Sequence, residues 1–320
     1  MTQPAELVHV VRNGLVESVH TGDVAVCDAD GRLRAWAGDP ERPLFGRSCE
    51  KPLQAVVSYA AIGQELSDHE VAVMCGSHSG EPVHVAAVRR LLRRGPVSPS
   101  KLRNPRDRMT KGERPPIFDN CSGKHAACLV ASVRRGWDVD RYLSPSHPLH
   151  RRVMRAMTAA TDVERPRIGI DGCGLPVHGM PLRAMATMYA RLGEPGRWGR
   201  LAPAADRIAR GMLAAPHLVG GTNRLDTDVM TAAPGAVLAK EGAEGLLCAT
   251  SIPLGIGVAL KVRDGNWRRA APAFVRVLRD LDMLAGAAEE PLRRHAELPL
   301  TGGDAVQGSV EPVVRLRASR

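Results

Sequence analysis

The chain has 320 residues, 44% of them hydrophobic and 24% charged, which is typical of soluble proteins and enough to bury a substantial core. The net charge of +10 comes from scattered arginines, and aromatic residues make up 3%, which argues against a nucleic-acid surface with stacking platforms. Seven cysteines, no charged-then-apolar leader and no apolar run of bilayer length predict a soluble, cytoplasmic protein without a disulfide framework or a membrane partner.

Alternating apolar and polar residues predict an antiparallel meander over residues 7–37, with turns at "RNG" and "DADG". From residue 48 the apolar spacing lengthens to that of helices, and strand-like runs return at 245–265 and 305–318. We expect the first and last strands to pair. The Pro-rich stretch 103–116 is interpreted as a long ordered loop. Helical spacing is predicted in residues 48–63, 84–95, 147–162, 181–193 and 201–216.

Ser48 and Lys51 lie three residues apart where the helical spacing begins. If Ser48 is the N-cap, Pro52 falls at the fourth helical position, where the backbone N–H has no intrahelical partner and proline loses no hydrogen bond. The Lys51 amine then shares a face with the hydroxyl and can accept its proton if burial lowers the amine's pKa. Ser-x-x-Lys also occurs in plain helix caps, so the spacing alone leaves both interpretations open. The two roles are compatible, and we expect Ser48 to be the N-cap of the helix in either case.

Four further segments carry small or polar residues where a plain core would not: 74–84, 119–129, 171–182 and 255–265. Their glycines allow tight turns and close approach of a ligand, although any one of them is also compatible with an ordinary turn. The sequence alone does not distinguish Cys121 and Cys173 from small buried hydrophobic residues. We interpret the remaining cysteines as packing residues: Cys27, Cys49, Cys75, Cys128 and Cys248.

Together, "RSCEKP", "SHSGEP", "NCSGKHA", "DGCGLP", "GAEG" and "GVALKV", in this order, resemble the bacterial L-asparaginases II of the rhizobial type, the thermolabile class. The resemblance covers nearly the whole chain. It implies a serine β-lactamase-like fold of the α/β class, an α+β sandwich in which an antiparallel sheet has helices on both faces. The whole chain, residues 1–320, is then a single catalytic domain whose N- and C-terminal strands form the sheet around a helical middle region.

The resemblance implies an L-asparagine amidohydrolase that releases L-aspartate and ammonia, and a homodimer. It makes Ser48 the nucleophile and Lys51 its proton acceptor. A second Ser-Lys pair would join Lys261 to a serine of "SHSG", and Ser79 is slightly favoured over Ser77. The residues expected to contact the substrate are Arg47, Ser77, His78, Asp171 and Arg224.

The resemblance also implies a zinc ion bound by Cys121, Lys124 and Cys173. Two thiolates suit zinc, but a lysine ligand must be neutral, which costs about 4.6 kcal/mol at pH 7 from its reference pKa. His84 and His125 fall inside the motif segments and are expected around the site. Arg224, Asp226 and Glu244 are candidates for the substrate's charged groups, with surface ion pairs as the alternative.

The sequence lacks the Ser-Asp-Asn and Lys-Thr-Gly elements of β-lactamases and transpeptidases, and has "SHSG" and "LKVRDG" instead. Hydrolysis of a small amino-acid amide is therefore favoured over β-lactam chemistry. The alternatives are a related amidase or acylase acting on glutamine or a β-lactam, and a non-catalytic metal-binding or nucleic-acid-binding protein.

Overall fold

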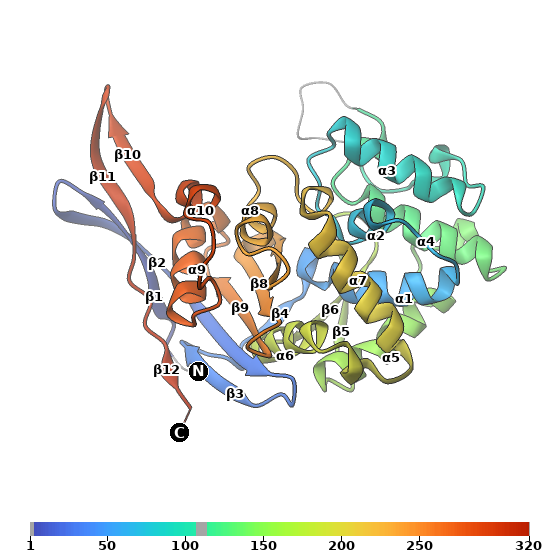
Figure 1. Cartoon of the computed structure of the whole chain (residues 1–320), viewed down its shortest axis with the longest axis horizontal. Coiled ribbons are helices and arrows are strands. Elements are labelled where there is room, and N and C mark those ends of the chain that lie inside the picture. The colour runs from blue at the N-terminus through green and yellow to red at the C-terminus, as the bar shows by residue number, and fades with distance from the viewer. Residues whose placement is uncertain (1–2, 107–113, 320) are drawn as a thin grey trace. The chain divides into compact units, whose positions relative to one another are not determined.

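The computed structural model describes residues 3–106 and 114–319 (Figure 1). The predicted loop over 103–116 lies in part, at residues 107–113, outside the described residues. The chain divides into two compact units, which we call the sheet unit and the helical unit. Whether they act as a single catalytic domain stays a prediction. The sheet unit comprises Met1–Leu44, Met180–Gly193 and Asp228–Arg320, and the helical unit comprises Phe45–Gly179 and Glu194–Thr227.

The sheet unit is built on an antiparallel sheet whose main path runs β10-β11-β1-β2-β9-β8-β7, with β3 beside β2 and β12 beside β3 (Figure 1). Strand β1 pairs with β11, with Val8 opposite Pro312, which confirms the predicted pairing of the first and last strands. The strands are β1 Ala5–Arg12, β2 Leu15–Asp28, β3 Leu33–Ala37, β7 Val237–Gly242, β8 Leu246–Ser251, β9 Ile256–Val262, β10 Leu298–Gly302, β11 Ala305–Pro312 and β12 Arg317–Ala318.

The predicted "RNG" turn joins β1 to β2. Asn13 and Gly14 have φ angles of +47° and +82°, and positive φ at both central residues is typical of the type I′ turns that connect strands most tightly.

Helices cover both faces of the sheet, as predicted. Val258, Ala259 and Leu260 of β9 are all fully buried, and successive strand residues point to opposite faces. Helix α6 packs against β2, β8 and β9, and α9 packs against β1 and β11. A Cβ at Gly257 would lie 2.1 Å from the Ala186 carbonyl oxygen, so glycine lets β9 contact α6 closely. These helices are α6 Leu182–Gly193 and α9 Trp267–Asp280, with α8 Leu225–Ala232 and α10 Glu289–Ala296 elsewhere in the chain.

The helical unit is organised around α1, which packs against α2, α4, α5 and α7. A small sheet has the order β4-β6-β5, and its strands β4 and β6 run across the unit boundaries in the sequence. Its hairpin, β5–β6, carries candidate residues in its turn. The helices are α1 Lys51–Ile62, α2 Asp68–Cys75, α3 Pro82–Arg93, α4 Ser122–Arg134, α5 Pro148–Thr161 and α7 Ala202–Ala214, and the strands of the small sheet are β4 Pro43–Phe45, β5 Arg167–Ile170 and β6 Pro176–Pro181.

The sequence predicted α1, α3, α5, α6 and α7, and it missed α2, α4, α8, α9 and α10. Helices α2 and α4 lack the periodic pattern by which the five were predicted. Residues Glu70–Cys75 of α2 and Ser122–Ser132 of α4 are buried without interruption, so neither helix has a polar face to create a 3.6-residue period. The two helices approach closely at Gly123, where a Cβ would lie 2.0 Å from the Val73 carbonyl oxygen.

Among the described residues, no helix combines the length and the apolar character needed to cross a membrane.

Candidate active site

Ser48 is not the N-cap of α1, so that prediction is wrong. It lies inside a short 3₁₀-helix, η1 (Arg47–Glu50), whose N-cap is Gly46, and Glu50 is the residue that precedes α1. The Lys51 N–H donates to the Ser48 carbonyl oxygen. Because the chain already turns tightly over these residues, the helical path starts before Lys51 and Ser48 lies within it. The Ser48 side chain is half-buried.

Arg47, directly before Ser48, has a φ angle of +43°, which is uncommon for a non-glycine residue. Its Nε donates to Asp171 Oδ1 at 2.9 Å. Asp171 follows β5 and has an 8% exposed side chain. Burial alone raises the pKa of Asp171, but the positive charges of Lys124 and Arg47 outweigh it and lower that pKa below its usual value. The turn before α1 is therefore held by a buried, negatively charged carboxylate.

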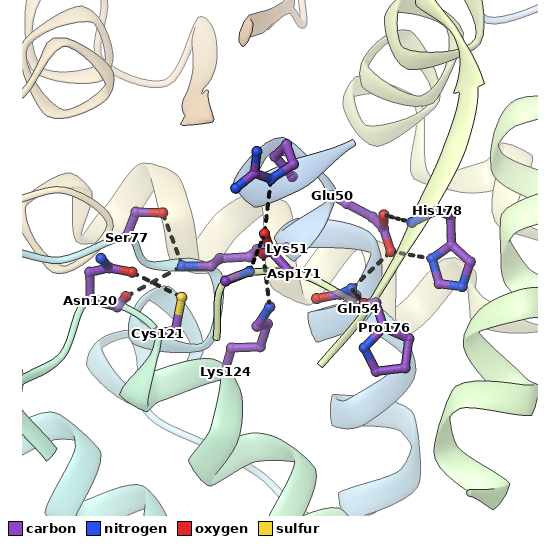
Figure 2. Close-up of polar contacts among 12 residues, drawn as sticks. Glu50, Lys51, Gln54, Ser77, Asn120, Cys121, Lys124, Asp171, Pro176 and His178 are labelled. Atoms are coloured by element: carbon purple, nitrogen blue, oxygen red, sulfur yellow. Dashed lines mark hydrogen bonds and ion pairs between the residues drawn. The ribbon is translucent and has the colours of Figure 1, made fainter. Parts of the chain in front are cut away.

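Lys51 is fully buried at the centre of the candidate site (Figure 2). Its Nζ lies 2.5 Å from the Gly76 carbonyl oxygen, 2.9 Å from Ser77 Oγ and 3.3 Å from the Asn120 carbonyl oxygen. Carbonyl oxygens can only accept, whereas a hydroxyl can both donate and accept. Among these partners, the Ser77 hydroxyl is therefore the one that can exchange a proton with the amine.

The two serines of "SHSG" have different partners. The Ser77 hydroxyl contacts Lys51, whereas Ser79 Oγ donates to the Gly220 carbonyl oxygen at 3.1 Å. Arg224 Nη1 donates to the Ser77 carbonyl oxygen at 3.1 Å. The structure thus brings Ser77 and Arg224 to the Lys51 site, while Ser79 faces the backbone of the neighbouring loop.

Cys121, Lys124 and Cys173 are also brought together. Cys121 is the N-cap of α4, Lys124 lies in its first turn, and Cys173 lies in the turn between β5 and β6. A hydrogen bond from the Cys121 thiol and the positive charge of Lys124 lower the pKa of Cys173 to about 5, against the effect of burial. The same thiol–thiol hydrogen bond and burial raise the pKa of Cys121. Lys124 Nζ lies 3.9 Å from Asp171 Oδ2 (Figure 2).

The fit of this cluster to zinc depends on its chemistry. Across residues 3–106 and 114–319, no group of three His, Cys, Asp or Glu side chains is placed to hold a metal ion. The predicted zinc ligands, Cys121, Lys124 and Cys173, are not such a group, because the third donor is a lysine amine. Two converging thiols fit zinc. The negative charges of Cys173, Cys121 and Asp171 outweigh burial and raise the pKa of Lys124, so an ion bound there must displace the lysine proton.

His78, predicted to contact the substrate, is engaged within the protein at both ring nitrogens. Its Nδ1 accepts from the Gly80 N–H at 3.2 Å, so Nε2 carries the proton and donates to Ser122 Oγ at 3.0 Å. The ring stacks on His84 with centroids 4.9 Å apart, and His84 stacks on His217 at 5.4 Å. His78 therefore connects the "SHSG" loop to the start of α4.

Lys261 lies on β9 in the sheet unit, opposite Asp23. Its amine donates to the Val262 carbonyl oxygen, and burial, with the nearby charge of Arg42, lowers its pKa. Since Ser77 and Ser79 belong to the helical unit, the second Ser-Lys pair stays a prediction.

Of the other candidates, Asp226 is 1% exposed and accepts from the Thr227 N–H at 3.0 Å, while Glu244 is exposed in the sheet unit. The cysteines interpreted as packing residues are all free and buried. The sequence analysis missed Gly76 and Asn120, whose backbone carbonyl oxygens accept from Lys51. It also missed Glu50, which precedes Lys51 in the sequence and is fully buried. A backbone carbonyl contact leaves no signal in the residue type, whereas Glu50, a charged residue at the start of an apolar helix in a quoted motif, offers one.

A buried histidine on α5 predicts a pH dependence of stability. His150 is 5% exposed, its Nε2 donates to the Tyr142 carbonyl oxygen at 2.7 Å, and burial lowers its pKa to about 4. Because the unfolded chain binds this proton near pH 6.5 and the folded chain does not, stability is lost as pH falls from 6.5 toward 4. The loss reaches about 2 kcal/mol at pH 5 from this residue.

Urea unfolding at pH 7.5 and pH 5.0 measures this effect. His150→Gln should show a smaller difference between the two pH values than the wild type. His69→Gln, a change at an exposed residue of α2, should not. Equal differences in all three proteins would contradict the assignment.

Comparison with solved structures returned neighbours of low similarity. Mglu in its native form shares 15% identity over 84% of this chain and 67% of its own, with a TM-score of 0.49. A Bacillus glutaminase shares 14% identity over 82% and 92% of the two chains, with a TM-score of 0.48. A β-lactamase described as putative, from Bacteroides dorei, shares 11% identity over 81% and 93%, with a TM-score of 0.45. Neighbours with TM-scores below 0.5 do not identify a substrate.

A search of curated proteins gave no match. The family model described as L-asparaginase II matches residues 8–312, which is nearly the whole chain and includes every motif segment described above. The chain therefore belongs to the L-asparaginase II family.

Proposed function

We propose that this amidohydrolase cleaves the side-chain carboxamide of L-asparagine through an acyl-enzyme on Ser48. The observation that carries the proposal is the buried Lys51 amine, three residues from Ser48 and 2.9 Å from the Ser77 hydroxyl, in a chain of the L-asparaginase II family. A lysine enclosed in this way is the type of group that activates a serine when its amine is neutral.

In the proposed reaction, Ser48 Oγ attacks the carboxamide carbon and neutral Lys51 takes the hydroxyl proton. The tetrahedral intermediate then expels ammonia, which leaves with a proton from the lysine, and an ester to Ser48 remains. Water hydrolyses the ester, giving L-aspartate and free Ser48. Ser77 supports this scheme because its hydroxyl shares the amine of Lys51, and we propose it, ahead of Ser79, as the second serine of the site.

The charged groups of the substrate need fixed partners of opposite sign. Asp171, whose pKa is lowered, is proposed to pair with the α-ammonium group. Arg47 and Arg224 are proposed partners of the α-carboxylate. We assign His78 to positioning the loop, since both of its ring nitrogens are engaged. Lys261 is retained as a proposed second base.

We also propose that zinc binds through Cys121, Lys124 and Cys173. The bound ion would supply positive charge that orients the substrate, and a serine nucleophile makes metal-activated water unnecessary. The protein as purified is expected to contain about one zinc per chain by elemental analysis. Cys173→Ser should weaken zinc affinity about 100-fold, because a hydroxyl replaces a thiolate ligand.

Cys128→Ser is the matched control, since Cys128 is a buried cysteine of α4 outside the proposed ligand set. It should keep its zinc. Equal zinc content in the wild type and Cys173→Ser after dialysis against a weak chelator would contradict the proposed zinc site.

The substrate proposal is tested by ammonia release from L-asparagine, with D-asparagine, L-glutamine and a chromogenic β-lactam alongside. Selective turnover of L-asparagine supports it. Preference for L-glutamine would make the protein a glutaminase, and turnover of the β-lactam would make it an amidase that opens the lactam ring. Silence on every substrate, with folding confirmed, would favour a binding protein. Light scattering and fractionation test the accompanying proposal of a cytoplasmic homodimer without nucleic-acid or membrane partners.

A further inference from the structure

The carboxylate of Glu50 is fully buried two residues after Ser48. Its Oε1 accepts from His178 Nδ1 at 2.5 Å and from Gln54 Nε2 at 2.8 Å. Its Oε2 accepts from the His178 backbone N–H at 3.0 Å. Gln54 Nε2 also donates to the Pro176 carbonyl oxygen at 3.3 Å, so the contacts link the start of α1 to strand β6 (Figure 2).

His178 contacts the chain on both sides of Ser48. Its backbone carbonyl oxygen accepts from the Gly46 N–H at 2.9 Å, before Ser48. Its backbone N–H and its ring donate to Glu50, after Ser48. One residue of β6 therefore fixes both ends of the segment 46–50. We call the contacts among Gly46, Glu50, Gln54 and His178 the Glu50 clamp.

Fold stability alone does not call for a carboxylate at this position. A buried charge needs several strong hydrogen bonds to offset its desolvation, and well-packed apolar groups are often at least as stable. What the clamp supplies is a fixed backbone path. That path is unusual, since Arg47 has a positive φ and Ser48 lies in a 3₁₀ turn, and such conformations persist only where the surroundings determine them.

A serine nucleophile is sensitive to placement, because an error of about 1 Å at a reacting atom can cost about 100-fold in rate. We propose that Glu50 is a positioning residue, which acts through His178 to hold Ser48 in its attacking geometry. The proposal rests on the proposed function, in which Ser48 is the nucleophile. Glu50 itself does not take part in proton transfer.

The test compares Glu50→Gln with Glu70→Gln. Glu70 is a matched control because its carboxylate is also buried in the helical unit, 1% exposed, and is held by Ser67 and Arg94 at α2. Glu50→Gln keeps the shape but replaces a carboxylate oxygen that accepts hydrogen bonds with an amide group that donates. We expect kcat for L-asparagine to fall about 10- to 100-fold with KM within about twofold, since binding groups remain in place.

Glu70→Gln should lower the melting temperature and leave kcat unchanged. Wild-type kcat in folded Glu50→Gln would overturn the proposal, and so would equal kcat losses in the two variants. If Glu50→Gln does not fold, Gln54→Met takes its place, because it removes one donor to Glu50 and retains the carboxylate. A kcat equal to that of the wild type in this variant would count against the clamp.

A second readout separates this inference from the proposed function. An alkyl fluorophosphonate labels an activated serine without requiring the natural substrate, and mass spectrometry locates the modified residue. Labelling of Ser48 that slows about 10-fold or more in Glu50→Gln supports the clamp even if L-asparagine is not the substrate. An unchanged rate of Ser48 labelling in Glu50→Gln would contradict the positioning role of Glu50 without contradicting the proposed function.

Discussion

Replacing Ser48 with alanine is expected to abolish ammonia release from L-asparagine and to leave the fold intact. In the proposed mechanism Ser48 Oγ forms the bond to the substrate, and removing a nucleophile commonly costs about 10³-fold or more in kcat. Ser48 is half-buried and its backbone lies in a short 3₁₀-helix, where alanine is well tolerated. A coupled ammonia assay and a melting curve measure the two outcomes.

The other serines provide the comparison. Ser77→Ala should reduce kcat more than Ser79→Ala, because Ser77 contacts Lys51 whereas Ser79 donates to a backbone carbonyl. Full turnover in Ser48→Ala would dismiss the assignment of the nucleophile. If turnover were lost in Ser77→Ala instead, the nucleophile would move to Ser77.

Lys51→Met is expected to reduce kcat/KM by about 10³-fold or more, because methionine has a similar length and no amine to accept the serine proton. The loss of the amine also leaves the carbonyl oxygens of Gly76 and Asn120 without this donor, which costs about 1–3 kcal/mol for each. Removal of the buried amine offsets part of that cost. Activity should therefore fall far more than stability, as steady-state kinetics and urea unfolding will show.

Lys240→Met is the matched control, since Lys240 of β7 is 1% exposed and lies in the sheet unit. It should retain turnover per folded molecule. Lys51→Arg should not restore activity, because a guanidinium stays protonated at working pH. Wild-type kcat/KM in Lys51→Met would rule out the lysine as base.

The sequence was most informative where a segment carries a clear strand or turn pattern of its own. The turn at Asn13-Gly14 follows from positive-φ preferences, and the pairing of β1 with β11 follows from two strand patterns at opposite ends of the chain. Helices α2 and α4 have no amphipathic period, because the protein buries the runs Glu70–Cys75 and Ser122–Ser132 without interruption. Their identity depends on neighbours that a single segment does not reveal.

The candidate site shows the same division. The motifs identified the segments that form the site, but they did not identify the contacts between them. Ser77 and Lys51 are 26 residues apart, and the "SHSG" loop that carries Ser77 is held by backbone hydrogen bonds to residues 219–220. No local spacing distinguishes Ser77 from Ser79 in that loop. The predicted cap at Ser48 was wrong because η1 extends the helical path by one turn before α1. A serine at the start of a helical pattern gives the same sequence signal whether it is the N-cap or lies within a preceding 3₁₀-helix.

The glycine of Cys-Ser-Gly-Lys has a consequence for how such motifs are interpreted. Gly123 lies within a helix, and its missing side chain lets α4 rest directly on the backbone of α2 at Val73. Any larger residue would push the two helices apart and shift Cys121 and Lys124 together with the first turn of α4. Gly123, although it lies within a motif of reactive residues, therefore sets the distance between α4 and α2. That distance in turn determines where Cys121 and Lys124 lie.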